Sequence, residues 1–378
     1  MSLRTPLCDV LGIEHPILQS GMGGVAGPDL VAEVSKAGGL GILAGLSVPP
    51  EELRKRIRRV RELTDRPFGV NLWLHADLRP PADVAAIPES EIRAVQSTLN
   101  RFRERLGLAA TLARPAPVPD IIDAELEVIL DERPAVFSTA LGLPSPETVR
   151  RCHERSIRVV AMVATLEDAR AAAGLGVDAI VAQGDEAGGH RSIGVTPAPG
   201  QHIGVATLVL VPQVVDAVRL PVVAAGGIAD GRGLVAALAL GAAGILLGTR
   251  FVATRESAAP EFRKKAVLEA ESEATMVSSS VTGLPARYLR NAFAAEYDAS
   301  GTPVLPAMIQ SNAADDIFKA AAARQETAYI PMATGQSAGL IRDLPGAGEV
   351  VQAIVREAEA VLDRLSSGRA RPSRKGQP

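Results

Sequence analysis

A short apolar run followed by a helical pattern recurs eight times between residues 16 and 271, and this alternation restricts the possible folds most. The first run is "PILQSG" (Pro16–Gly21) and the last is "GILLGTRF" (Gly244–Phe251). Several runs are apolar throughout, as expected of strands that are buried on both faces in parallel pairing. Eight right-handed βα crossovers over about 250 residues predict an α/β fold of the (β/α)8 TIM barrel type. An open doubly wound sheet is the alternative and fits this length and number of units less well.

The alternation is interrupted once and then ends, which predicts the domain organisation. Residues 75–120 contain a helical pattern bounded by proline-rich turns, so we expect a helical insertion there. The barrel is predicted to span residues 1–271. Residues 272–365 are less regular and predict a helical appendage packed on the barrel. The polar, basic tail of residues 366–378 has the composition of a disordered segment.

Charge and cysteine content exclude several classes of protein. A formal net charge of -3 gives no overall attraction to nucleic acid or to an anionic membrane. No apolar run reaches the length of a membrane span, and the N-terminal residues lack the apolar core of a signal peptide. Cys8 and Cys152 are the only cysteines, which predicts neither a disulfide framework nor a metal site. We therefore expect a cytoplasmic protein without nucleic-acid or membrane partners.

Five segments with chemically distinctive residues occur at or near the ends of predicted strands. In a TIM barrel the active site lies at the carboxyl ends of the strands, so these segments are expected to converge there. The five are "QSGMGG" (Gln19–Gly24), Asn71, "QGDEAGGH" (Gln183–His190), "AGGI" (Ala225–Ile228) and "LGTRF" (Leu247–Phe251).

Glycines after the last two strands predict a phosphate site. Many TIM barrels bind phosphate with the loops that follow strands seven and eight. Gly226, Gly227 and Gly248 would let backbone N–H groups approach phosphate oxygens, and a helix N-terminus would add partial positive charge. Thr249 could add a hydroxyl donor. The alternative is that these glycines only form tight turns, but their occurrence in both expected loops favours phosphate.

His190 ends a glycine-rich loop and is the candidate catalytic residue. A histidine there could act as a base or donate a hydrogen bond to a developing anion. A purely structural role is the alternative, and the position of the loop at the catalytic face favours function. The amide of Gln183 can donate and accept at once, which suits the edge of a heteroaromatic ring. Asp185 and Glu186 are interpreted as loop polarity rather than as an acid/base pair.

Six motifs together resemble the nitronate monooxygenase family, formerly called 2-nitropropane dioxygenases. They occur in the order "PILQSGMGG", "GVNL", "AQGDEAGGH", "AAGGI", "LGTRF" and "GQSAGLI", and span about Pro16 to Ile341. The "EAGGH" element is specific to this family and its near relatives. The resemblance implies a barrel that binds FMN, with His190 as the catalytic residue.

The resemblance also implies which residues contact FMN. Met22 and Gly23 would lie near the flavin ring, Asn71 and Gln183 would bind through side chains, and Gly188 through its backbone. The family often has glutamine where this chain has Leu246, so only a backbone contact to the phosphate is expected at that position. The full expected set is Gly21, Met22, Gly23, Asn71, Gln183, Gly188, Gly189, Gly226, Gly227, Leu247, Gly248 and Thr249.

The reaction implied by the resemblance is the oxidation of alkyl nitronates, such as propionate 3-nitronate, by O2. The nitronate would pass an electron to FMN, and its radical would react with O2 to give a carbonyl compound and nitrite. The partners would be the small-molecule nitronate and O2, and a homodimer is left open. Alternatives on the same scaffold are an FMN-dependent NAD(P)H:quinone reductase and an enoyl-acyl-carrier-protein reductase. A non-catalytic flavin-binding protein is a further alternative, which would not require His190.

Overall fold

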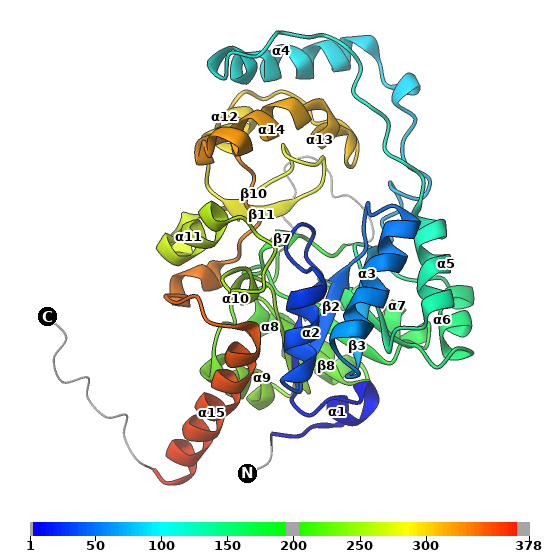
Figure 1. The fold of residues 1–378 in the computed structure, drawn as a ribbon, viewed down its shortest axis with the longest axis vertical. Helices are drawn as coiled ribbons and strands as arrows, with labels where there is room; N and C mark the ends of the chain where they lie inside the picture. Colours follow the sequence, from blue (N-terminus) through cyan, green and yellow to red (C-terminus); the bar gives the residue numbers. More distant parts are fainter. Residues whose placement is uncertain (1–2, 194–203, 369–378) are drawn as a thin grey trace, which may run out of the picture.

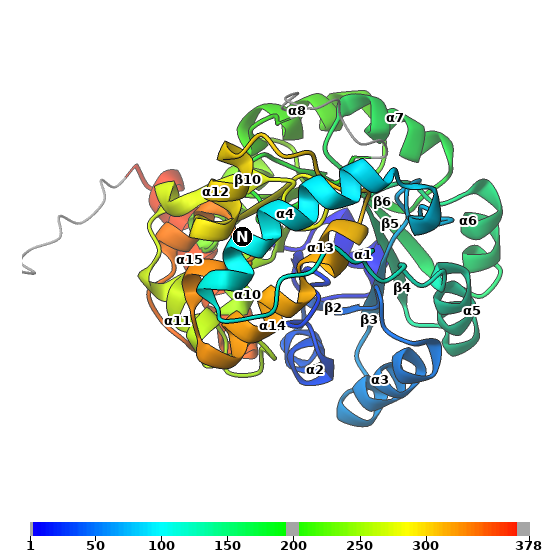
Figure 2. The ribbon, with the colours of Figure 1, turned by 90° about the horizontal axis from the view of Figure 1, so that it is seen from above.

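The computed structural model describes residues 3–193 and 204–368, and its centre is a closed barrel of eight parallel strands (Figure 2). Barrel closure comes from the pairing of the first strand with the last, in the register Ile17 to Ile245 and Gln19 to Leu247. This confirms the predicted TIM barrel. The strands are β1 (Ile17–Gln19), β2 (Leu40–Ala44), β3 (Phe68–Trp73), β4 (Val136–Ala140), β5 (Arg158–Val163), β6 (Ala179–Gln183), β8 (Val222–Ala225) and β9 (Gly244–Leu247).

The outer helices begin where the sequence supplies helix starts. Proline occupies the first turn of several of them, where its missing N–H costs no hydrogen bond. Ser145, Thr165 and Asp230 are N-caps whose side chains accept hydrogen bonds from backbone N–H groups of the first turn. These helices are α2 (Pro28–Lys36), α3 (Pro50–Leu63), α5 (Ile122–Glu132), α6 (Pro146–His153), α7 (Leu166–Gly174), α8 (Thr207–Ala217) and α9 (Gly231–Ala239).

A short helix that was not predicted, α1 (Pro6–Leu11), closes the lower end of the barrel in Figure 1. Its Leu7 and Leu11 are buried with side chains of the barrel interior, including Leu18 and Val223. A helix of six residues is too short to show a hydrophobic period, which is why it was not predicted. Because α1 fills this end, the candidate site lies at the opposite end of the barrel.

The predicted helical insertion contains the short 3-10 helix η1 (Val84–Ala86) and the long helix α4 (Glu89–Arg105). Figure 1 shows α4 above the helices of the appendage, at a distance from the barrel. Arg103 is 2% exposed and joins the two segments, because it binds Asp316 at 2.7 Å and donates to the Ala313 carbonyl at 2.7 Å. We call α4 with α12 (Ala292–Ala299), α13 (Ile309–Ala313) and α14 (Asp315–Arg324) the cap.

The predicted helical appendage also contains strands, because a three-stranded antiparallel sheet connects it to the barrel. Its strands are β10 (Thr275–Ser278), β11 (Ala286–Leu289) and β7 (Gly189–His190), with β11 in the middle. Ala286 pairs with His190, so the histidine loop is held by a strand from the appendage. Strands of two to four residues lie below the length at which alternation can be recognised, which explains why they were missed.

The remaining elements connect the barrel to the C-terminus. Helix α15 (Ala347–Ser366) packs against α9 and α2, so it covers the outside of the barrel (Figure 1). It ends at Ser366, the first residue of the predicted disordered tail, and residues 369–378 lie outside the described residues. The elements are α10 (Thr249–Val252), α11 (Glu261–Glu269), η2 (Ser272–Ala274), η3 (Thr327–Tyr329), η4 (Gln336–Leu340) and α15 (Ala347–Ser366).

Candidate active site

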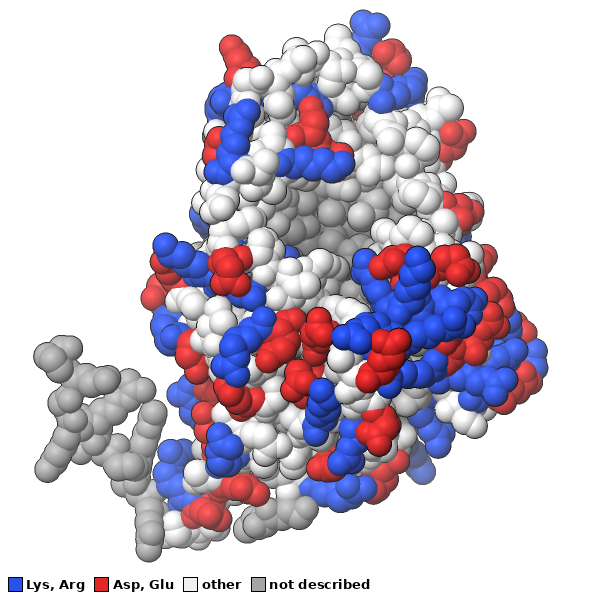
Figure 3. Space-filling view, viewed as in Figure 1, with Lys and Arg blue, Asp and Glu red and all other residues white. Residues whose placement is uncertain are grey.

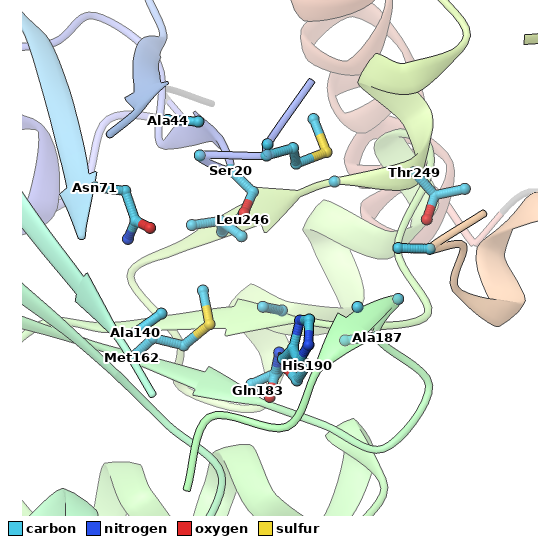
Figure 4. A pocket seen from close by; sticks show the side chains of 18 of the residues that line it. Ser20, Ala44, Asn71, Ala140, Met162, Gln183, Ala187, His190, Leu246 and Thr249 are labelled. Carbon is cyan, nitrogen blue, oxygen red and sulfur yellow. The ribbon is translucent and has the colours of Figure 1, made fainter. Parts of the chain in front are cut away.

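A cavity of about 390 Å³ lies at the carboxyl ends of the barrel strands. Figure 4 shows Asn71 and Thr249 at opposite sides of it, with His190 between them. Every residue predicted for the site lines this cavity: Gly21, Met22, Gly23, Asn71, Gln183, Gly188, Gly189, His190, Gly226, Gly227, Leu247, Gly248 and Thr249. The structure therefore brings together segments that are widely separated in the sequence.

The imidazole of His190 is held on two sides. Its Nε2 atom lies 2.8 Å from the Thr282 hydroxyl, and its ring centroid lies 4.4 Å from that of Trp73 in an edge arrangement. Burial lowers the pKa of His190 to about 3, and the charges of His75 and Arg191 act in the same direction. The ring is consequently neutral at neutral pH, and it can accept a proton or donate one hydrogen bond.

The acidic and basic residues of the histidine loop have structural partners. Asp185 binds the Arg287 guanidinium at 3.0 Å. Glu186 accepts hydrogen bonds from the Thr207 backbone N–H at 2.9 Å and from the Thr207 hydroxyl at 2.8 Å, at the start of α8. Arg191 donates to the Gly184 carbonyl at 2.9 Å. These bonds fix the loop conformation, which agrees with the interpretation that Asp185 and Glu186 supply loop polarity.

Two amide side chains line the cavity: Gln183 is the last residue of β6, and Asn71 lies within β3. The Gln183 Nε2 donates to the His190 carbonyl at 2.9 Å, and its Oε1 accepts from the Ser192 N–H at 2.8 Å. The Asn71 Nδ2 contacts the Ser138 carbonyl and hydroxyl, each at 3.2 Å. Gln183 thus positions the histidine loop, and its second N–H remains for a ligand because a side-chain amide carries two.

The glycine loops after β8 and β9 form another part of the wall. Gly226 and Gly227 have φ of 109° and 70°, a left-handed conformation that side chains disfavour. Among the described residues, the backbone network gives neither N–H an acceptor. The Thr249 hydroxyl accepts a hydrogen bond from the Gly335 N–H at 2.9 Å, which brings the "GQSAGLI" segment into the site.

Several lining residues were not predicted. Trp73 could have been found, since it lies two residues after Asn71 on the same face of β3. Tyr288 and Met308 come from the appendage, and Arg263 comes from α11. All three lie outside the barrel strands, so the register of those strands does not indicate that they face the cavity. Thr282 is identified only by its contact with His190.

The arginine-rich stretch of residues 54–61 lies outside this site. Arg54, Arg58 and Arg61 each bind the carboxylate of Glu132 on α5, at 2.7–3.1 Å. Figure 3 shows the corresponding mixture of basic and acidic side chains over these helices. The stretch is therefore a salt-bridged helix face. Figure 3 also shows a hollow with mostly uncharged walls between the cap and the barrel.

Residues 3–193 and 204–368 contain neither a metal-binding cluster nor a membrane-spanning helix. No group of histidine, cysteine, aspartate and glutamate side chains is arranged to hold a metal ion. No helix in these ranges combines the length and the apolar character needed to cross a membrane.

Comparison with known proteins identifies the family. The family model described as nitronate monooxygenase matches residues 4–357, which is nearly the whole chain. The chain belongs to the nitronate monooxygenase family. The nitronate monooxygenase of Paraburkholderia phytofirmans is 38% identical over 96% of this chain and 97% of that protein. A probable nitronate monooxygenase of Staphylococcus saprophyticus is 32% identical over 96% of this chain and 100% of that protein.

Solved structures agree with this family assignment. Nitroalkane oxidase from Streptomyces ansochromogenes has a TM-score of 0.86 and 33% identity, covering 95% of this chain and 99% of that chain. FabK from Thermotoga maritima has a lower TM-score of 0.74 at 32% identity, covering 97% of this chain and 99% of that chain. As a member of the nitronate monooxygenase family, the protein is an oxidoreductase enzyme.

Proposed function

We propose that this protein uses FMN to oxidise alkyl nitronates, such as propionate 3-nitronate, with O2 to a carbonyl compound and nitrite. The observation that carries the proposal is one cavity that contains both a neutral histidine and glycine amides to which the described backbone offers no acceptor. Membership of the nitronate monooxygenase family and similarity to a nitroalkane oxidase support this reaction over the alternatives.

The residues present fit FMN. The backbone amides of Gly226 and Gly227, with Gly248 and Thr249, would hold the phosphate, since backbone N–H groups suit phosphate oxygens. A Cβ on Gly23 would meet no atom within 4 Å, so this part of the wall leaves room for a ligand. Asn71 and Gln183 would bind the ring edge through their amides. When bound, FMN would supply the redox chemistry of the reaction.

His190 would act on the substrate in one of two ways. With an anionic nitronate, the neutral imidazole N–H would donate a hydrogen bond to a nitro oxygen. With a neutral nitroalkane, the unprotonated ring nitrogen would accept the α-proton. Thr282 and Trp73 would keep the ring in place for either role.

Trp73 provides a direct test of cofactor binding, because it is the single tryptophan of the chain and lines the cavity. We expect added FMN to quench most of the tryptophan emission of the apoprotein, since flavin absorbs at the wavelengths where tryptophan emits. The measurement is a fluorescence titration with FMN, with free tryptophan as the control for inner-filter effects. Emission that stays constant while flavin binds elsewhere would contradict this placement.

Steady-state assays test the proposed reaction. The FMN-loaded protein is supplied with propionate 3-nitronate in air, and O2 uptake and nitrite release are followed together. We expect both, without any need for a nicotinamide. Steady NAD(P)H oxidation with a quinone or an enoyl thioester, and no nitrite from the nitronate, would instead favour a reductase. The ion-paired arginines of α3 offer no unpaired basic patch for an acidic carrier protein, which favours the nitronate reaction.

A further inference from the structure

Arg263 lines the cavity but was not expected to contribute to it. It lies on α11, and its Nη2 atom donates to the Ala333 carbonyl at 3.2 Å. Its Nε atom is buried and has no hydrogen-bond partner in the part of the chain that the structure describes. Burial alone lowers the pKa of Arg263, with no carboxylate acting in the opposite direction. Among the described residues, none forms a salt bridge with it.

Four more deeply buried arginines show how unusual this lack of a carboxylate partner is. Removing a guanidinium from water is costly unless an opposite charge and hydrogen bonds replace the lost solvation. Four arginines of this chain are less than a tenth exposed, and each has a carboxylate partner. These pairs are Arg103 with Asp316, Arg191 with Asp185, Arg250 with Asp343 and Arg287 with Asp185. Arg263 is half-buried at the cavity wall and lacks a carboxylate partner among the described residues, as expected of a cation whose partner is a ligand.

Hydrogen bonds connect Arg263 both to the cavity wall around Tyr288 and to the glycine loop that contains Thr249. Its acceptor, Ala333, forms a β-bridge with Tyr288, which lines the cavity. Two residues further along the chain, Gly335 donates to the hydroxyl of Thr249 in the glycine loop after β9. The Arg263 guanidinium is therefore attached to the segment that connects the predicted phosphate end with the wall of the substrate space.

We propose that Arg263 binds an oxyanion of a ligand in this cavity, either the phosphate of the flavin or the carboxylate of a charged substrate. An arginine fork suits both groups because it can donate two parallel hydrogen bonds. The assignment of the oxyanion to flavin phosphate rests on the proposed function. The inference that Arg263 binds an anion does not depend on it. If the oxyanion is the flavin phosphate, the glycine amides would orient it through hydrogen bonds and Arg263 would neutralise its charge.

The first test compares FMN with riboflavin, which lacks the phosphate, as ligands of the apoprotein. If Arg263 binds the flavin phosphate, Arg263→Met weakens FMN binding by about 10- to 100-fold and leaves riboflavin binding unchanged. Arg263→Lys restores part of the loss. Lys265→Met is the matched control, because it removes a cation from the same helix at a side chain that is 73% exposed. Binding is followed by Trp73 fluorescence.

The second test addresses the substrate. If Arg263 binds a carboxylate, Arg263→Met raises the KM for propionate 3-nitronate by about 10- to 100-fold but not that for propane 1-nitronate, which carries no carboxylate. Both substrates contain the nitronate charge, so its contribution cancels. FMN affinity would stay at the wild-type value in this case.

A third measurement separates this inference from the proposed function. Inorganic phosphate should raise the unfolding temperature of the wild-type apoprotein and have a smaller effect on Arg263→Met, whether or not the protein binds flavin. Failure of the wild-type protein to bind either flavin would contradict the proposed function alone. Equal responses of wild type and Arg263→Met to phosphate, to both flavins and to both nitronates would overturn the oxyanion role of Arg263.

Discussion

Replacement of His190 by alanine is expected to lower kcat/KM for a neutral nitroalkane by about 100- to 10,000-fold, the usual contribution of a positioned base. The loss should be smaller for a preformed nitronate, because that substrate has already lost its α-proton and needs only a hydrogen bond. The ratio of the two losses, measured as nitrite release, assigns the role of the imidazole. His153→Ala is the control, because His153 pairs with Asp178 on the outer surface and lies outside the cavity.

Full turnover by an FMN-loaded His190→Ala variant would contradict the catalytic assignment. The pKa of about 3 adds a pH test. A base with this pKa is already unprotonated at pH 5, so His190 should cause no fall in kcat/KM between pH 8 and pH 5.

The same pKa has a consequence for the stability of the apoprotein. The folded pKa lies below the ordinary value of 6.5, so the unfolded state binds more protons as the pH falls below that value. Wild type should therefore lose more stability than His190→Ala between pH 6.5 and pH 4, as measured by urea midpoints. Parallel losses would show that His190 titrates normally.

Gly188→Ala is expected to abolish FMN retention and to destabilise the fold by about 1–3 kcal/mol, the usual cost of overpacking. A Cβ at this position would lie 2.6 Å from the Thr334 carbonyl carbon and would also clash with the Gly335 N–H. Both obstacles are backbone atoms, so one of the two segments must move. This movement would disturb the histidine loop and the bond from Gly335 to Thr249 together.

The matched control is Gly174→Ala at the end of α7, where an added Cβ meets no atom within 4 Å. We expect that change to be neutral or stabilising by about 0.5–1 kcal/mol, because alanine is the better helix residue. The measurements are the flavin-to-protein ratio after purification and the urea midpoint. A Gly188→Ala protein with a full flavin content would show that the two segments are not tightly packed.

The barrel could be predicted because its signals are local and repeated. Each strand is an apolar run such as "RVVAMV" in β5, and a helical pattern follows, often with a proline or a capping residue at its start. In such barrels the active site lies at the carboxyl ends of the strands. This rule alone predicts that Asn71, His190 and Gly226 lie in one site. Glycine and histidine in those loops stood out against an apolar background.

The rest of the site could not be predicted because it depends on contacts between distant segments. Thr282 reaches His190 only because β11 pairs with β7, a pairing of very short strands. Arg263 lies in a charged helix whose sequence resembles a solvated surface. The position of α4 above the appendage depends on the buried Arg103, which in the sequence looks like any surface arginine.

The central claim is that the flavin of this protein takes electrons from a nitronate. The most direct measurement mixes the FMN-loaded protein, without O2, with propionate 3-nitronate and separately with NADH and NADPH, and records the flavin absorbance. We expect rapid loss of the oxidised flavin spectrum with the nitronate and none with the nicotinamides. Complete bleaching by a nicotinamide, with no change on addition of nitronate, would contradict the claim and identify a reductase.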